Sequence, residues 1–481
     1  MTNSITLLQR RADFADPHDC TDAADDLTIL SAVFDTLIRR HNLSFVPHLA
    51  ESWTVSSDAR IWRFGLRAGV KFHDGTACDA TAVAHSLRRM AREDKGYTLG
   101  APAVWRQYLG DAKIEADGLD LQISLGAPVA DLLDVLVQGY IASPATLARM
   151  DAGNMVKVAG TGPYRLADLS PGMVRLERAN DHFAGSPANQ TLIFRAVPDA
   201  DTRAQMLRNG KAQVATNLPY EASLRPPDTR IETLNPVAII FLMNAARGPL
   251  ADSRVRRALD LALDRKALVR GVMAGGAYPL QGFISPVHFG AGKDPAPTRD
   301  VSGARSLLAS AGYPDGLKLG VSCPTRLPDE AVRLTSHLAR QLAQIGVTLD
   351  VTYHEDREAY AHMVRRKEIR DLAVFDSSPL STYRVLVEKL DARVRGSWWE
   401  GYHNLGVEAF IDQARSCTDT ATRADIYARA YKLLQQDPPW LTLYNPVRVT
   451  GLAGSHPGFA LPADAVLDAA RLPAFAGVQN G

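Results

Sequence analysis

Cysteine is scarce in this chain, and its placement excludes a common kind of metal site. The 481 residues include four cysteines, which are widely scattered: Cys20, Cys78, Cys323 and Cys417. A structural zinc site needs ligands at short, regular spacings, and the sequence has neither a C-x-x-C pair nor a cysteine–histidine cluster. We expect separate thiols that behave as small apolar side chains, although spacing alone does not decide whether any two form a disulfide.

Long apolar runs and an excess of one charge are also missing. No stretch approaches about eighteen consecutive apolar residues, so no membrane-spanning helix is expected. Lys and Arg together number 54 and Asp and Glu 53, for a formal charge of +1. This balance excludes the basic surface typical of proteins that bind nucleic acid or anionic membranes. The printed start lacks the basic, apolar and small-residue segments of a secretory signal, and Ile5–Leu8 has the pattern of a first strand.

Catalytic motifs are absent as well. The sequence contains no G-x-S-x-G elbow, no H-E-x-x-H helix, no P-loop and no paired carboxylates at a useful spacing. Gly160-Thr161-Gly162 has the glycines of a phosphate loop, but no lysine follows them. A hydrolase that uses Asp376 or His403 is therefore kept only as an alternative.

The stretch over 47–90 shows what the chain does contain. Apolar and aromatic residues alternate on both sides of Ser56-Ser57-Asp58, which predicts two strands joined by a turn. Asp74-Gly75 predicts a tight turn. Asp79 then stands as the N-cap of a helix whose apolar face consists of Val83, Leu87 and Met90. None of these groups carries catalytic chemistry, so we interpret the stretch as scaffold.

Several blocks of the sequence follow one another in a recognisable order. They are Leu49-Ala50-Glu51-Ser52-Trp53, Arg67–Thr76, Gly160–Leu166, Asp252–Arg265, Ala304–Gly316 and Gly401–Asn404. The first two match the patterns LAESW and R-x-G-V-x-F-H-D-G-T. With these blocks the chain resembles the family 5 extracellular solute-binding proteins of ABC importers, the peptide/nickel/opine-binding group. The resemblance extends from Ile5 to about Gly451.

The resemblance implies an α/β chain with a two-lobed periplasmic-binding-protein-like fold. The expected form is the large three-domain variant of type II, with a ligand cleft between the lobes. Lobe I is expected to comprise 1–45, 158–240 and 445–481, with a small accessory domain at 46–157, and lobe II to comprise 241–444. The strand–helix–strand order over 317–353 by itself predicts a right-handed βαβ unit.

Candidate ligand-binding residues gather after the strand predicted at 372–375. Asp376 and Ser377 stand at the end of this strand, where α/β proteins place ligand groups. The family's element here, G-W-x-x-D-x-x-D-P, is only partly kept, because this chain lacks the Gly-Trp pair and the second acid. Aromatic rings that can stack on a solute and an arginine that can hold a carboxylate follow: Tyr383, Arg384, Trp398, Trp399 and Tyr402. Asn244, at the end of the apolar run over 239–244, is a further candidate. For each tryptophan, anchoring of the loop to the core is the alternative.

By resemblance, the expected function is that of the substrate-binding protein of an ABC transporter. It would capture a small polar solute, such as an oligopeptide or an opine, and deliver it to membrane permease subunits. We expect no cofactor, no metal, no nucleic-acid partner and a monomer. His403 has no second histidine near it in the sequence, which disfavours a nickel site. Whether the ligand is a peptide, an opine, a sugar or a metal complex stays open.

The expected location is the periplasm, with a signal peptide either removed or encoded upstream of Met1. The missing signal leaves a cytoplasmic location as the alternative. In that case the chain would be an intracellular ligand sensor built on the same fold.

Overall fold

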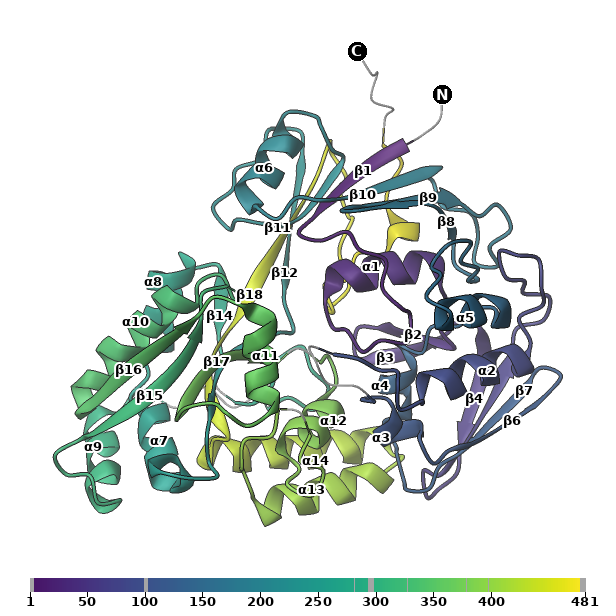
Figure 1. Cartoon of the computed structure of the whole chain (residues 1–481). Helices are drawn as coiled ribbons and strands as arrows, with labels where there is room; N and C mark the ends of the chain where they lie inside the picture. The colour runs from purple at the N-terminus through teal and green to yellow at the C-terminus, as the bar shows by residue number, and fades with distance from the viewer. Residues whose placement is uncertain are drawn as a thin grey trace. The chain divides into compact units, whose positions relative to one another are not determined.

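The computed structural model describes residues 4–98, 103–280, 282–292, 298–326, 328–377, 379–396 and 398–475. The chain forms two compact units that alternate along the sequence (Figure 1). Unit 1 combines Met1–Thr98, Pro102–Thr233 and Arg448–Gly481, and unit 2 is built mainly from Leu234–Val447. Each unit has strands and helices of its own.

The main sheet of unit 1 is built around β1 (Ser4–Gln9), which confirms the expected first strand. β1 pairs in parallel with β10 (Thr191–Ala196) and with β11 (Val214–Leu218). Beyond β10 the sheet continues, antiparallel, with β9 (Met173–Arg178) and β8 (Tyr164–Ser170). Its buried face contributes Ile5, Leu7, Val174, Leu192 and Phe194 to the core of the unit.

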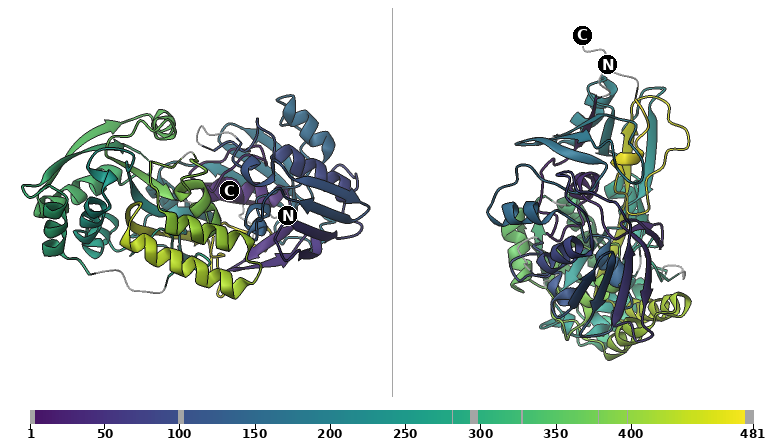
Figure 2. Two further views of the ribbon diagram at one scale, coloured as in Figure 1. Left: turned by 90° about the horizontal axis from the view of Figure 1, so that it is seen from below. Right: turned by 90° about the vertical axis from the view of Figure 1, so that its right-hand side faces the viewer.

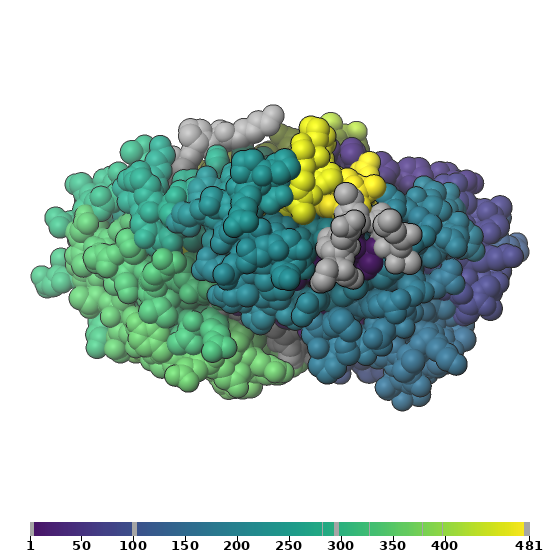
Figure 3. Space-filling view, turned by 90° about the horizontal axis from the view of Figure 1, so that it is seen from above, coloured from purple at the N-terminus to yellow at the C-terminus, as the bar shows by residue number. Residues whose placement is uncertain are grey.

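The C-terminal segment returns to this core. The second half of β18 (Trp440–Leu452) pairs antiparallel with β11, with Val214 opposite Leu452. Leu467 and Leu472 pack in the same cluster as Ile5. Figure 3 shows the yellow C-terminal residues lying against teal residues of the same unit. Unit 1 therefore joins the first and last described elements of the chain.

The stretch over 47–90 contributes two strands and a helix to unit 1, and the two strands belong to a second sheet. Its strand order is β4 (Ala50–Val55), β5 (Ile61–Leu66), β7 (Asp120–Ser124) and β6 (Lys113–Asp117). The next helix, α2 (Ala80–Met90), begins as predicted, since the Asp79 carboxylate accepts a hydrogen bond from the Ala82 N–H at 2.9 Å. The predicted apolar face is buried: Val83, Leu87 and Met90.

The apolar residues of the segment over 25–39 recur at helical spacing, which predicts one amphipathic helix, but the second half of this prediction is wrong. Helix α1 spans Ala24–Val33 and ends where Phe34 adopts an extended backbone. A hairpin of β2 (Ile38–His41) and β3 (Ser44–Pro47) follows, with Ile38 opposite Pro47. The apolar spacing at 33, 34, 37 and 38 fits a helix as well as it fits this arrangement, because all four side chains are buried either way.

Unit 2 contains the predicted βαβ unit. Strand β15 (Leu317–Pro324) leads through α10 (Ala331–Leu342) to β16 (Val347–His354), which pairs with it in parallel. On the other side β15 pairs in parallel with β17 (Leu372–Ser377). β13 (Ala238–Met243) lies antiparallel to β17 and to the first half of β18. The buried residues of these strands form one core with helices of the same unit.

Helices α13 (Leu405–Ser416) and α14 (Thr420–Gln436) run side by side in unit 2, as both figures of the whole chain show (Figures 1 and 2). The remaining elements are α3 (Arg106–Leu109), α4 (Leu132–Leu136), α5 (Pro144–Asp151), α6 (Ala200–Arg208), β12 (Thr229–Leu234), α7 (Ser253–Leu261), α8 (Arg265–Met273), β14 (Ala277–Pro279), α9 (Val301–Ser310), α11 (Arg357–Arg365) and α12 (Thr382–Val385), with single turns of other helix types at Pro249–Ala251, Ala343–Ile345, Leu386–Leu390 and Ala469–Arg471. The four cysteines are free, as expected, and three of them are buried.

Candidate ligand-binding site

Asp376 and Ser377 lie together at the C-terminal end of β17, as the sequence predicts. The Asp376 side chain is partly exposed, and its backbone carbonyl accepts a contact from Lys389 Nζ at 3.4 Å. Ser377 is buried, and its hydroxyl has no hydrogen-bond partner among the described residues. A buried hydroxyl without a partner costs free energy, so a ligand that supplies the missing bond is favoured here.

Tyr383 and Arg384 lie on the short helix α12, which follows directly. Both side chains are buried. Ser381 caps this helix by accepting a hydrogen bond from the Arg384 N–H at 3.2 Å. The Arg384 guanidinium donates to Glu388 at 2.8 Å, so its charge is already paired with a carboxylate of the chain. A solute carboxylate at Arg384 would have to compete with Glu388.

The two tryptophans differ in their surroundings. Trp398 is buried and packs on Phe375 of β17, with 4.5 Å between ring centroids. Trp399 is only partly buried, and its indole N–H donates to the Tyr402 carbonyl at 2.6 Å. Tyr402 is buried, and its hydroxyl donates to the Asp437 carbonyl at 3.1 Å. Trp398 thus anchors the loop, and Trp399 is the ring better placed to stack on a solute.

The structure does not bring Asn244 together with Asp376. In the β13–β17 pair, Asp376 stands opposite Ile239, whereas Met243 stands opposite Leu372. At about 3.4 Å per residue the two levels are about 17 Å apart along the strands. The Asn244 amide oxygen accepts from the Ala246 N–H at 3.3 Å, so this side chain holds the turn after β13. A ligand role for Asn244 has no support from this geometry.

Glu400 was missed by sequence reasoning, although it follows the two tryptophans directly. It is buried, and one of its carboxylate oxygens lacks a partner within the described part of the chain. Burial raises the pKa of Glu400 to about 8, because it outweighs the attraction of Lys367 and Arg247. The Glu400 backbone carbonyl accepts from the Ala245 N–H at 2.9 Å, which ties this loop to the end of β13.

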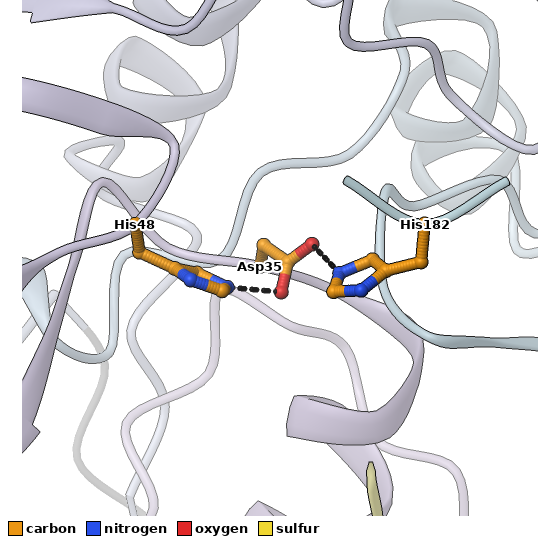
Figure 4. A group of neighbouring side chains, drawn as sticks. All are labelled: Asp35, His48 and His182. Atoms are coloured by element: carbon orange, nitrogen blue, oxygen red, sulfur yellow. Dashed lines mark hydrogen bonds and ion pairs between the residues drawn. The ribbon is translucent and has the colours of Figure 1, made fainter. Parts of the chain in front are cut away.

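A second polar cluster, also missed, lies in unit 1 and consists of Asp35, His48 and His182 (Figure 4). Asp35 is fully buried between the two imidazoles, and each carboxylate oxygen faces one of them. His48 Nε2 lies 2.5 Å from Oδ1, and His182 Nε2 lies 3.2 Å from Oδ2. His182 is 147 positions from Asp35, so no local pattern could reveal the cluster.

The electrostatics of this cluster favour an ionised carboxylate and a neutral imidazole. Burial alone would raise the pKa of Asp35, but the two histidines and Arg39 together hold it well below its usual range. Burial lowers the pKa of His48, despite the attraction of Asp35. Both histidines line a pocket of about 810 Å³ in unit 1.

The comparison with known families decides the identity. Residues 44–383 match the model of the bacterial extracellular solute-binding proteins, family 5 (middle region). The chain belongs to this family. As a family 5 protein it is a substrate-binding protein of an ABC importer, which binds a small ligand or peptide and delivers it to permease subunits, and it is not an enzyme. None of the helices among the described residues combines the length and apolarity needed to cross a bilayer.

Individual relatives agree along nearly the whole chain. The glutathione-binding protein GsiB of Escherichia coli (strain K12) is 29% identical over 470 residues, which cover 93% of this chain and 90% of that protein. The binding protein AgaA from A. tumefaciens R10, solved with agropinic acid, superposes with a TM-score of 0.81 at 21% identity and covers 97% of both chains. DppA from Helicobacter pylori, solved with the peptide STSA, gives 0.78 at 21% identity, covering 96% of this chain and 97% of that one. These similarities confirm the two-lobed fold of family 5.

Proposed function

We propose that this family 5 protein captures a small polar solute that carries a carboxylate, either a short peptide or an opine. The family match over 44–383 carries the proposal. The ligands of the relatives agree with it, since glutathione, agropinic acid and the peptide STSA are all small polar molecules. The family's element at this position has a second acidic residue, which this chain lacks, so that Asp376 is the only carboxylate left in it. This difference favours a ligand other than an ordinary peptide held by its amino group.

Within unit 2, the proposed contacts are Asp376, Ser377 and Trp399. Ser377 offers a buried hydroxyl that lacks a partner within the described residues, Asp376 offers a partly exposed carboxylate, and Trp399 offers a partly exposed ring. The Tyr402 carbonyl accepts a hydrogen bond from the Trp399 indole, and Trp398 packs on Phe375, the residue before Asp376. Tyr383 and Arg384 remain candidate contacts on the helix that follows Ser377. In the proposed arrangement, lobe I comprises 1–45, 158–240 and 445–481 with the accessory domain at 46–157, and lobe II comprises 241–444. A solute that contacts both lobes would favour a closed state.

A thermal-shift panel tests the proposal. Glutathione, agropinic acid, the peptide STSA, a dipeptide, an oligosaccharide and a nickel–histidine complex are added separately to the purified full chain. A ligand at 100 times its Kd stabilises the folded state by about 2.7 kcal/mol, which raises the Tm by several degrees. A rise in Tm with one class of carboxylate-bearing compounds supports the proposal. If none of the compounds raises the Tm, the proposal is overturned.

Matched variants then locate the site. Asp376→Ala and Ser377→Ala are expected to weaken the shift given by the active ligand, while Asp425→Ala, which removes an exposed carboxylate of α14, leaves it unchanged. An unchanged affinity in Asp376→Ala removes Asp376 from the site.

We also propose that the protein works in the periplasm, where family 5 binding proteins meet their solutes. Osmotic-shock fractionation of the native host tests this. Recovery in the shock fluid supports the importer role, and recovery only in the cytosol indicates an intracellular sensor instead.

A further inference from the structure

Asp35, His48 and His182 offer a set of side-chain ligands that suits a metal ion. One ligand atom from each residue can be chosen so that all three lie within 4.8 Å of one another. A divalent ion with bonds of about 2.0–2.2 Å holds tetrahedral ligands about 3.3–3.5 Å apart. His48 Nε2 and His182 Nε2 lie 2.5 and 3.2 Å from the carboxylate oxygens. Shifts of about 1 Å in the ligand atoms therefore separate this arrangement from the spacing of a bound ion.

The carboxylate is held in place by groups outside this set. Thr161 donates its hydroxyl hydrogen to Asp35 Oδ2 at 3.0 Å, and Arg39 donates to Oδ1 at 3.1 Å. Such outer partners orient metal ligands in proteins. Arg39 also pairs with Asp468 at 3.4 Å, so its positive charge is shared between two carboxylates. Because Arg39 is shared in this way, it neutralises the negative charge of Asp35 only in part, and the remaining negative charge can attract a cation.

Access to the cluster comes from the pocket of unit 1. His48 and His182 both line this pocket, whereas Asp35 lies behind them. The pocket is about 810 Å³ in volume, large enough to admit hydrated ions and small solutes. A water or a solute donor from the pocket can complete the coordination, since three protein ligands leave at least one position open.

We propose that Asp35, His48 and His182 form a binding site for a divalent transition-metal ion of the Zn²⁺ or Ni²⁺ type. Two imidazoles and one carboxylate select such borderline ions, whereas Mg²⁺ and Ca²⁺ prefer oxygen ligands alone. Each imidazole binds through Nε2 in the tautomer that carries its proton on Nδ1. The proposal does not depend on the identity of the transported solute, because all its ligands and its pocket lie in unit 1.

Isothermal titration calorimetry on tag-free, EDTA-treated full chain tests the site. Zn²⁺ and Ni²⁺ are each expected to bind at one equivalent with a Kd below about 10 µM, and Mg²⁺ is expected to give no heat. His48→Gln and His182→Gln should each weaken binding at least tenfold. His41→Gln is the matched control, because His41 lines the same pocket but stands outside the ligand set. Equal affinity in all four proteins would overturn the proposal.

X-ray absorption on the wild-type chain gives a result that does not depend on how the variants fold. With one equivalent of Zn²⁺ or Ni²⁺, the spectrum is expected to show two imidazole ligands and oxygen for the rest of the shell. A shell without histidine, or the absence of one-to-one binding, means that the cluster is a hydrogen-bonded His–Asp–His group only. If no solute raises the Tm but one metal ion binds per chain, the proposed solute is rejected and the proposed metal site is retained.

Discussion

His18 illustrates how a single buried residue can be read from its partners. The sequence places it beside the Asp16-Pro17 turn, which indicates a structural role rather than a ligand. In the structure its ring is fully buried, Nε2 donates to the Tyr140 carbonyl at 3.0 Å, and Arg89 donates to Nδ1 at 2.8 Å. This pairing needs a neutral imidazole, and it satisfies both ring nitrogens.

The first prediction is that His18 destabilises the protein in mild acid. Burial, and next the positive charge of Arg89, lower the pKa of His18 to about 4. In the unfolded chain the pKa is about 6.5, so the unfolded state binds more protons between these values and stability is lost as the pH falls from about 6.5 to about 4. The contribution of this one group is about 3 kcal/mol. Urea unfolding of wild type and His18→Gln at several pH values measures it.

The His18→Gln variant should show a shallower loss of stability over that range, because glutamine does not titrate. His403→Gln serves as the control, since His403 is exposed. Parallel pH profiles for wild type and His18→Gln would show that His18 does not couple folding to protons.

At the scale of single elements, the cap of α2 gives the second prediction. Asp79→Ala removes the acceptor of the Ala82 N–H and is expected to cost about 1 kcal/mol of unfolding free energy. Asp79→Ser keeps a capping oxygen and should lie close to wild type. The midpoints of guanidinium unfolding, at unchanged m-value, compare the three proteins. Equal losses in both variants would mean that the carboxylate acts through something other than the cap.

The loop with the two tryptophans gives the third prediction. Trp398→Ala should lower the stability of the ligand-free protein by about 3–5 kcal/mol, because the ring is buried against Phe375. Trp399→Ala should cost much less stability but reduce the thermal shift given by the bound solute. Differential scanning calorimetry with and without that solute measures both effects. The opposite assignment, with Trp398 acting on affinity alone, would show that the loop rearranges on binding.

An element could be predicted from the sequence when the residues that determine it lie close together along the chain. The cap at Asp79, the two strands β4 and β5 and the strand–helix–strand order over 317–353 follow from spacing within about forty residues, and all of them are confirmed. The helix expected over 25–39 failed because its apolar spacing also fits a chain that leaves the helix at Phe34 and forms a hairpin. The ligand role predicted for Asn244 stays a prediction, and its separation from Asp376 follows from the antiparallel pairing of β13 with β17, which spacing does not reveal.

The candidate metal cluster marks the limit of local reasoning. Asp35 follows a helix, His48 precedes a strand, and His182 comes from a loop far along the chain, so only the finished fold brings them together. Resemblance to a family predicted the fold class of the whole molecule. The resemblance could not predict the cluster of Asp35, His48 and His182, because the motifs that carry it do not include these three residues together.

At the scale of the whole molecule, the cysteines give the fourth prediction. Cys20, Cys78 and Cys323 are buried, and burial raises the pKa of the Cys78 thiol to about 12. The native protein should therefore expose a single fast-reacting thiol, Cys417, to Ellman's reagent, and the unfolded protein should expose all four. Stopped-flow absorbance at 412 nm follows both reactions. Fewer than four thiols in denaturant, without added reductant, would reveal a disulfide.

The interleaved chain path of unit 1 has a consequence for how the protein is made. A ribosome makes β1 more than 400 residues before Leu467 and Leu472, yet all three belong to one core. Most of unit 2 lies within one continuous stretch, Leu234–Val447, which can fold while translation proceeds. The core of unit 1 is complete only after the segment with Leu467 and Leu472 has been added, so its earlier strands lack part of their packing until then.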